Sequence, residues 1–160
     1  MNIIFLDIDG VLNCDIYFAK EKSEGIIKHP LSHICKERVG WLNELCAKTE
    51  AKVVLSSTWR YSGLKYCQDV LKEAGATFEI IDVTPNLRGE NCLRGNEILA
   101  WVKSNQELLG YEYDSDFKSY AIIDDDSDML YWQRNNFFQT DTYSGLTPNI
   151  CYKIKRFFNH

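Results

Sequence analysis

The chain has 160 residues, of which 45% are hydrophobic and 13% aromatic, and its net charge is −5. This composition excludes a disordered chain, and the acidic balance disfavours a broad electrostatic grip on nucleic acid. No apolar run approaches the roughly 20 residues that cross a bilayer, and the apolar start ends at Asp7 without a signal-peptide pattern. We therefore expect a cytoplasmic protein with no membrane association and a single domain, residues 1–160.

Short apolar runs alternate with stretches of helical spacing along the chain. In chain order, the runs that we expect to be strands are residues 3–6, 52–55, 78–81, 120–123 and 137–139. Apolar residues three or four positions apart predict helices within residues 32–49, 64–74, 94–102 and 150–158. This alternation predicts an α/β fold in which helices flank a mainly parallel sheet. Residues 13–31 and 82–93 show no periodicity, and loops of that length are often functional.

Carboxylates follow two of the predicted strands. Asp7 and Asp9 come directly after the first strand, and Asp124 and Asp125 come after the fourth. In an open α/β sheet, ligands bind beyond the carboxyl ends of the strands, where the strand order reverses. If these two strands are neighbours, the acidic pairs meet there and repel each other unless a cation neutralises them. Oxygen ligands favour a hard ion, and Mg²⁺ is the usual one with a phosphate substrate.

Other residues near the predicted strand ends fit a phosphate site. Gly10 allows a sharp turn after the first strand. Ser56 and Ser57 follow the second strand, where hydroxyls and backbone amides can hold phosphate oxygens. Arg94 stands where a helix begins, and its permanent charge can clamp a phosphate.

Several further residues have structural interpretations that require no catalytic or binding role. We interpret Asp126 and Asp128 as the solvated start of a helix, because Asp favours that end of the helix dipole. Tyr131 and Trp132, together with residues 137–138, are interpreted as core. Two interpretations stay open for Trp59 and Arg60: a base-stacking and phosphate-binding pair, or a core tryptophan with a satisfied arginine.

The pattern D-I-D-G-V-L-N at residues 7–13 resembles the first motif of the haloacid dehalogenase-like (HAD) phosphohydrolases. Ser56 matches the second motif by its position, Arg94 is similar to the third, which is usually Lys, and Asp124 with Asp125 resembles the paired-Asp form of the fourth. Arg88 is an alternative for the third motif. The segments 57–60, 94–98 and 139–146 further resemble the HAD domain of Swiss Army Knife RNA repair proteins.

This resemblance implies a Rossmann-type fold and a role for each residue. Asp7 would be the nucleophile that forms an aspartyl phosphate, and Asp9 would protonate the leaving group and then activate water. Mg²⁺ would be held by the Asp7 carboxylate, the main-chain carbonyl of Asp9, and Asp124 or Asp125. Ser56, Ser57 and Arg94 would hold the substrate phosphate.

The resemblance also bears on the substrate. HAD enzymes often carry cap insertions that select it, and the spacing of the motifs leaves room for little or no cap. An open site would admit bulky phosphates such as a nucleic-acid end. Two other functions remain: a receiver-like signalling domain, for which Asp82 gives weak support, and a non-catalytic HAD-fold subunit of a nucleic-acid repair assembly. The oligomeric state stays open.

Overall fold

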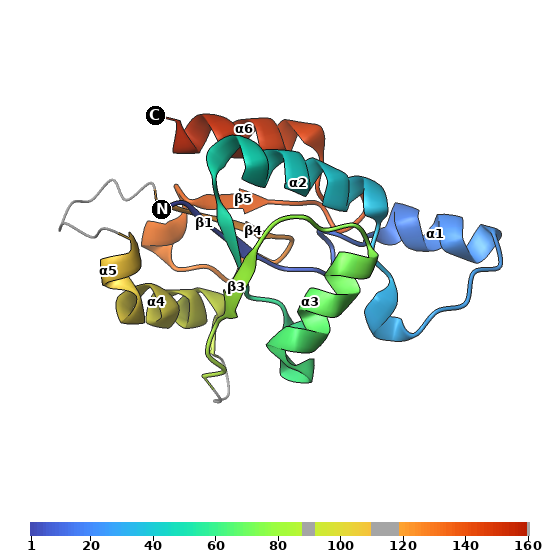
Figure 1. The fold of residues 1–160 in the computed structure, drawn as a ribbon, viewed down its shortest axis with the longest axis horizontal. Coiled ribbons are helices and arrows are strands. Elements are labelled where there is room, and N and C mark those ends of the chain that lie inside the picture. Colours follow the sequence, from blue (N-terminus) through green and yellow to red (C-terminus); the bar gives the residue numbers. More distant parts are fainter. Residues whose placement is uncertain (88–91, 110–118, 160) are drawn as a thin grey trace.

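The structure is a computed structural model that describes residues 1–87, 92–109 and 119–159. Its centre is a five-stranded sheet in the order β3-β2-β1-β4-β5, with every neighbouring pair parallel (Figure 1). The strands are β1 (Ile3–Leu6), β2 (Lys52–Leu55), β3 (Ile80–Val83), β4 (Tyr120–Asp124) and β5 (Phe137–Gln139). The predicted α/β fold with a parallel sheet is therefore confirmed. Because the order reverses between β1 and β4, the carboxyl ends of these two strands form the switch point.

Helices lie on both faces of the sheet (Figure 1). They are α1 (Asp15–Ser23), α2 (Lys36–Thr49), α3 (Leu64–Glu73), α4 (Arg94–Ser104), α5 (Gln106–Leu109) and α6 (Pro148–Phe158), with the 3₁₀ turns η1 (Pro30–Ser32), η2 (Thr58–Ser62) and η3 (Tyr131–Gln133). Of the helices described, none combines the length and hydropathy needed to cross a bilayer.

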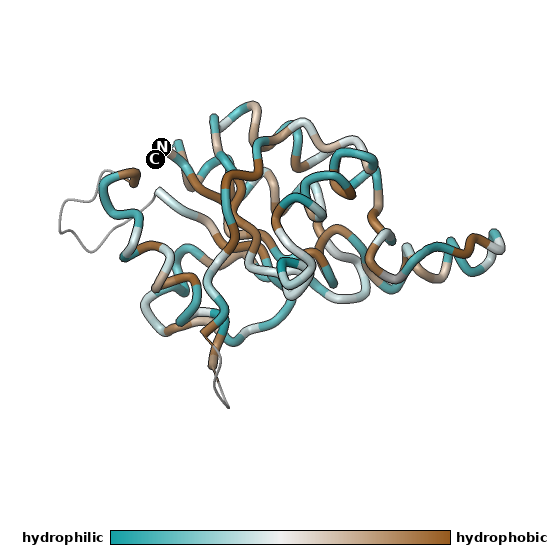
Figure 2. Tube along the Cα trace, turned by 60° about the horizontal axis from the view of Figure 1, so that its bottom comes forward, coloured by the Kyte–Doolittle hydropathy of each residue, from teal (hydrophilic) through white to brown (hydrophobic). Residues whose placement is uncertain are grey.

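The central strand β1 is buried on both faces, which explains its unbroken apolar sequence. Ile4 and Leu6 pack in one core with α2, α3 and α6, whereas Ile3 and Phe5 pack in the other with α4. Figure 2 shows the hydrophobic colour concentrated along the strands in the middle of the molecule. This two-sided burial holds the carboxyl end of β1 in a fixed position.

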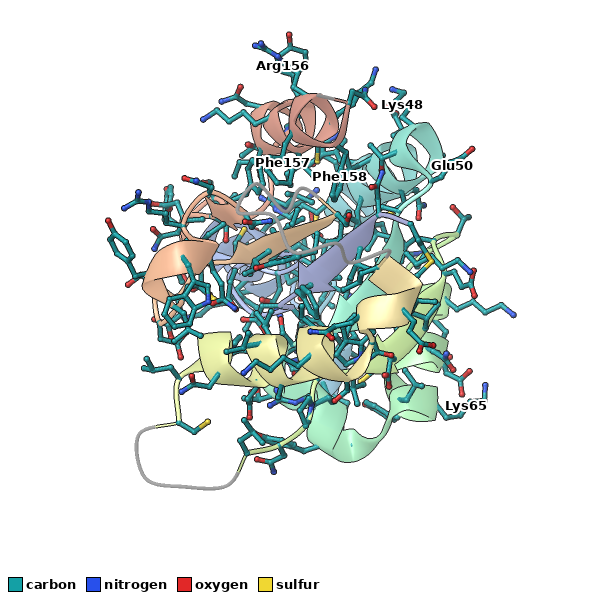
Figure 3. The ribbon with its side chains drawn as sticks, turned by 90° about the vertical axis from the view of Figure 1, so that its left-hand side faces the viewer. Lys48, Glu50, Lys65, Arg156, Phe157 and Phe158 are labelled. Carbon is teal, nitrogen blue, oxygen red and sulfur yellow. The ribbon has the colours of Figure 1, made fainter. Side chains whose placement is uncertain are left out.

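The last helix, α6, closes one face beside α2 (Figure 1). Thr147 accepts a hydrogen bond from the Ile150 amide at the start of the helix (3.4 Å), and proline follows at the first helical position. Phe157 and Phe158 point from α6 toward the sheet, and Arg156 points away from it (Figure 3). The one-sided apolar pattern of residues 150–158 thus predicts this helix and its buried face correctly.

Two elements differ from the prediction in position or kind. The third strand spans 80–83 rather than 78–81. The aperiodic stretch 13–31 contains α1, whose apolar residues do not gather on one face; Ile16 and Phe18 are exposed by 45% and 40%. The insertion between β1 and α2 contains this nine-residue helix and a single 3₁₀ turn. Little chain is therefore present to cover the carboxyl ends of the strands.

Two expectations about residues 126–132 are wrong. Residues 126–128 do not begin a helix: Asp126 is exposed in a bend, and Asp128 accepts a hydrogen bond from the Arg94 amide (2.8 Å) at the start of α4. Tyr131 and Trp132 are not core, because they lie in η3 and are exposed by 73% and 62%. The carboxylate of Asp128 instead caps a helix distant in sequence.

Candidate active site

Three carboxylates converge at the switch point of the sheet. Asp7 directly follows β1, Asp124 ends β4, and Asp125 follows it. Because β1 and β4 are paired with Leu6 opposite Ile123, the two acidic strand ends meet. One carboxylate oxygen from each of the three aspartates lies within 4.8 Å of the others. The predicted meeting of these acidic groups is therefore observed.

This cluster carries negative charge in a buried place. Asp7 is 5% exposed and Asp124 is fully buried. Burial raises the pKa of Asp7, although Arg94 and a hydrogen bond with Ser57 oppose the rise. Burial and the neighbouring Asp7 raise the pKa of Asp124 to about 8, against the effect of Arg94. Like charges held this close favour a bound cation.

Arg94 reaches into the cluster from the first turn of α4. Its Nε lies 3.1 Å from an oxygen of Asp124, and its Nη1 lies 3.6 Å from Asp7 and donates to the carbonyl of Ser56. The Arg94 amide is fixed by Asp128, so backbone and side chain are both held. The guanidinium thus stands between the two strand ends and the turn after β2.

Gly10 allows the turn after β1 to pass close to Asp125. Its φ is 68°, and a Cβ built there would lie 2.2 Å from an Asp125 oxygen. Thr140 donates to the Gly10 carbonyl (2.8 Å), and Thr142 donates to the Asp125 carboxylate (2.8 Å). The loop after β5 therefore holds both Gly10 and Asp125, which explains why a residue with a side chain does not fit at position 10.

Asp9 lies outside this group of three carboxylates and is exposed. Asn13 donates its side-chain amide to one oxygen of Asp9 (2.8 Å), and the indole N–H of Trp59 donates to the other (2.9 Å). Asn13 also accepts from the Gly10 amide (3.1 Å). The residues of the first motif are thus linked to one another and to the turn after β2.

The two serines after β2 are both fully buried. Ser57 is hydrogen-bonded to Asp7 and also accepts from the Trp59 amide (3.3 Å) at the start of η2. Among the described residues, the hydroxyl of Ser56 has no hydrogen-bond partner. An unpaired buried hydroxyl beside a charge cluster is a suitable donor for a ligand oxygen.

A buried ion pair supports this turn from behind. Arg60 donates to the carbonyls of Ser56 (2.6 Å) and Ser57 (2.8 Å), and pairs with Glu97 of α4. Trp59 and Arg60 are 3% and 6% exposed. Of the two interpretations left open, the structure favours a core tryptophan with a buried arginine over an exposed stacking pair; both Arg60 Nη atoms have partners, whereas its Nε has none among the described residues.

The residues present fit a hard divalent cation. Asp7, Asp124 and Asp125 supply only oxygen, the donor type that Mg²⁺ prefers. One buried oxygen of Asp124 has no hydrogen bond within the described residues, although Arg94 is near. A cation would offset the burial and the repulsion from Asp7 that raise the pKa of Asp124, and would favour its ionised form.

The candidate residues predicted from the sequence are therefore close together, with Asp9 directed toward Trp59. Arg88, the alternative cation, lies outside the described residues. Sequence reasoning missed the roles of Asn13, Trp59 and Thr142 as partners of the acidic residues. Asn13 and Trp59 stand inside the motifs considered, but their partners depend on how distant segments pack.

Comparison with known proteins agrees with this geometry. The profile of the family described as the HAD domain in Swiss Army Knife RNA repair proteins matches residues 3–150. No curated protein and no solved structure matches the chain. The match covers every strand and all the carboxylates of the cluster. The chain thus belongs to the family of HAD domains in Swiss Army Knife RNA repair proteins, with a HAD-type phosphohydrolase kind of function.

Proposed function

We propose that residues 1–160 form a single HAD-like hydrolase domain, a Mg²⁺-dependent phosphatase that cleaves a phosphomonoester through an aspartyl phosphate on Asp7. The observation that carries this proposal is the convergence of the buried Asp7 and Asp124 and the half-buried Asp125 within 4.8 Å at the switch point, with Arg94 beside them. Such a cluster is costly to bury and is typical of functional sites.

Asp7 is the proposed nucleophile. Its carboxylate attacks phosphorus, the bond from phosphorus to the leaving oxygen breaks, and Asp9 gives its proton to that oxygen. Water then attacks the phosphorus of the aspartyl phosphate, Asp9 takes a proton from that water, and the bond from phosphorus to the Asp7 oxygen breaks. Inorganic phosphate leaves, and Asp7 and Asp9 return to their starting states.

The substrate phosphate would be held on the side of the β2 turn. The unpaired hydroxyl of Ser56 and the hydroxyl of Ser57 would donate to its oxygens. Arg94 would add a fixed positive charge where charge develops during transfer. Mg²⁺, held by Asp7, Asp124, Asp125 and the main-chain carbonyl of Asp9, supplies charge neutralisation between the phosphate and the carboxylates when bound.

The proposed substrate class is a phosphorylated nucleic-acid end. The matching family is named for RNA repair proteins, and the short insertion after β1 leaves room for a bulky substrate. The test is a screen of 3′- and 5′-phosphorylated oligonucleotides against nucleotides, sugar phosphates and phosphopeptides. A preference for a small metabolite phosphate would contradict this class.

The phosphatase itself is tested with an aryl phosphate, with and without Mg²⁺. We expect Mg²⁺-dependent turnover that Asp7→Asn abolishes without loss of the fold, because the amide keeps the shape but not the anion. An Asp7→Asn variant that keeps a tenth of the wild-type kcat would exclude Asp7 as nucleophile. A stable phosphoprotein without turnover would favour the receiver-like alternative. Asp82, its supporting residue, lies on edge strand β3 and accepts from Trp101.

A further inference from the structure

Trp59 links the turn after β2 to Asp9. Its indole is 3% exposed, and its N–H donates to one oxygen of Asp9 at 2.9 Å. Asn13 donates to the other oxygen at 2.8 Å. Asp9 itself is exposed, so without these two donors its side chain would be free to change rotamer in water.

The Trp59 indole is packed in the hydrophobic core, and hydrogen bonds hold the Trp59 backbone. The Trp59 amide donates to Ser57 (3.3 Å), and the thiol of Cys67 in α3 donates to the Trp59 carbonyl (3.3 Å). Ser57 is at the same time hydrogen-bonded to Asp7. Two residues of one turn, Ser57 and Trp59, therefore contact the two carboxylates proposed for catalysis, Ser57 at Asp7 and Trp59 at Asp9.

We propose that Trp59 is a positioning residue that fixes the Asp9 carboxylate relative to the phosphate-binding turn. This inference rests on the proposed function of Asp9 as acid and base. Proton transfer requires the carboxylate to lie within hydrogen-bond reach of the leaving oxygen, and small misplacements are costly in rate. Because the same turn carries the phosphate donors, the carboxylate and the reacting phosphate share one rigid support.

The kinetic test uses Trp59→Phe, which keeps a ring but removes the N–H. We expect kcat to fall about 10- to 100-fold, since misplaced groups of this kind cost up to about 100-fold. The loss should be larger for an alkyl phosphate than for an aryl phosphate, because a poor leaving group needs more protonation. KM and inhibition by inorganic phosphate should stay within about twofold, because the phosphate donors are untouched.

Trp101→Phe is the matched control. Trp101 is also 3% exposed and donates its indole N–H to a carboxylate, that of Asp82 (2.7 Å), but it packs in the other core. The Trp101→Phe variant should lose about as much stability as Trp59→Phe and should keep the kcat of the wild type. In an Asp9→Asn background, Trp59→Phe should have no further effect on rate, because the group it positions is gone.

Either of two kinetic results would overturn the inference. One is that the wild type is active and Trp59→Phe has the same kcat as Trp101→Phe, or that Trp59→Phe changes only KM. The other is an additive rate loss in the Asp9→Asn background. A wild type that hydrolyses no phosphomonoester overturns the proposed function, and this inference falls with it.

The contact itself is tested without catalysis by NMR of the indole N–H groups, assigned with the Trp→Phe variants. Asp9→Asn should shift the Trp59 indole signal and leave that of Trp101 in place, and Asp15→Asn should shift neither. An unchanged Trp59 signal in Asp9→Asn would show that the indole does not hold Asp9 and would overturn the inference.

Discussion

Gly10 lies in the turn after β1, where the backbone passes close to the Asp125 carboxylate. Two separate features favour glycine at this position. Its φ of 68° is left-handed, and a Cβ built there would lie 2.2 Å from an Asp125 oxygen. The first concerns the backbone, and the second concerns the Asp125 carboxylate. A substitution there should therefore affect both stability and the cation site.

We predict that Gly10→Ala lowers stability by more than the roughly 1–2 kcal/mol of left-handed backbone strain and also weakens the response to Mg²⁺. Gly25→Ala is the control, since Gly25 has almost the same φ, 67°, and open space around its Cβ position. Thermal unfolding with and without Mg²⁺ measures both effects. If the two variants lose equal stability and respond equally to Mg²⁺, Gly10 does not serve the cluster.

At the same scale, some of the site could be predicted from the sequence and some could not. Asp7, Asp124 and Arg94 are placed by where strands end and a helix begins, and those positions follow from apolar runs and caps. The partner of Asp9 could not be found in this way. Trp59 is 50 positions from Asp9, and its indole reaches the carboxylate only because η2 and α3 pack as they do.

At the scale of the element, the insertion between β1 and α2 is held by a buried carboxylate, Glu21. Tyr17 donates to it at 2.5 Å, Lys28 pairs with it, and His33 lies 2.5 Å from its other oxygen. Burial raises the pKa of Glu21, but these partners outweigh it and lower the pKa to about 2. The insertion therefore gains stability from an ionised Glu21.

This network makes stability depend on pH in a defined direction. A carboxyl with a lowered folded pKa stabilises above its unfolded pKa near 4.5, and that stability is lost as pH falls toward 2. We predict that the stability difference between wild type and Glu21→Gln shrinks by about 2 kcal/mol between pH 7 and pH 3. Denaturant titration at both pH values measures it, with exposed Glu24→Gln as control. A difference that is constant with pH would mean that Glu21 is not ionised in this network.

The elements themselves were predictable to different degrees. Strands 3–6 and 52–55 have the bounds that their apolar runs predict, because buried parallel strands show no alternation. The half-buried edge strand 137–139 also has its predicted bounds. Helix α1 could not be predicted, because it is stabilised by Glu21 and its partners and its apolar residues form no stripe. The prediction that Tyr131 and Trp132 are core is wrong for a related reason, because hydrophobicity alone does not place a residue in the core.

At the scale of the whole molecule, a cation would join segments far apart in sequence. Asp7 comes from the first strand, and Asp124 and Asp125 come from the fourth. A ligand that binds only the folded state stabilises it in proportion to the logarithm of its concentration. Binding of Mg²⁺ should therefore be visible in global unfolding, independently of any substrate.

We predict that Mg²⁺ raises the Tm of wild type, and that Asp124→Asn needs at least about tenfold more Mg²⁺ for the same rise, a loss of about 1.4 kcal/mol in binding. Asp126→Asn should behave as wild type, because Asp126 is exposed and contacts Asp124 through its backbone amide. Calorimetry across a Mg²⁺ series distinguishes the variants. A large defect in Asp126→Asn with a normal Asp124→Asn would move the metal site along the chain.

In the proposed mechanism, Asp7 carries the phosphoryl group during turnover. The most direct measurement is acid quenching during hydrolysis of an aryl phosphate, followed by sodium borohydride reduction, which converts an aspartyl phosphate to homoserine, and mass spectrometry of the peptides. We predict homoserine at position 7, dependent on substrate and Mg²⁺, and none in Asp7→Asn. Turnover with an unmodified Asp7, or homoserine at Asp9, Asp124 or Asp125 instead, would contradict it.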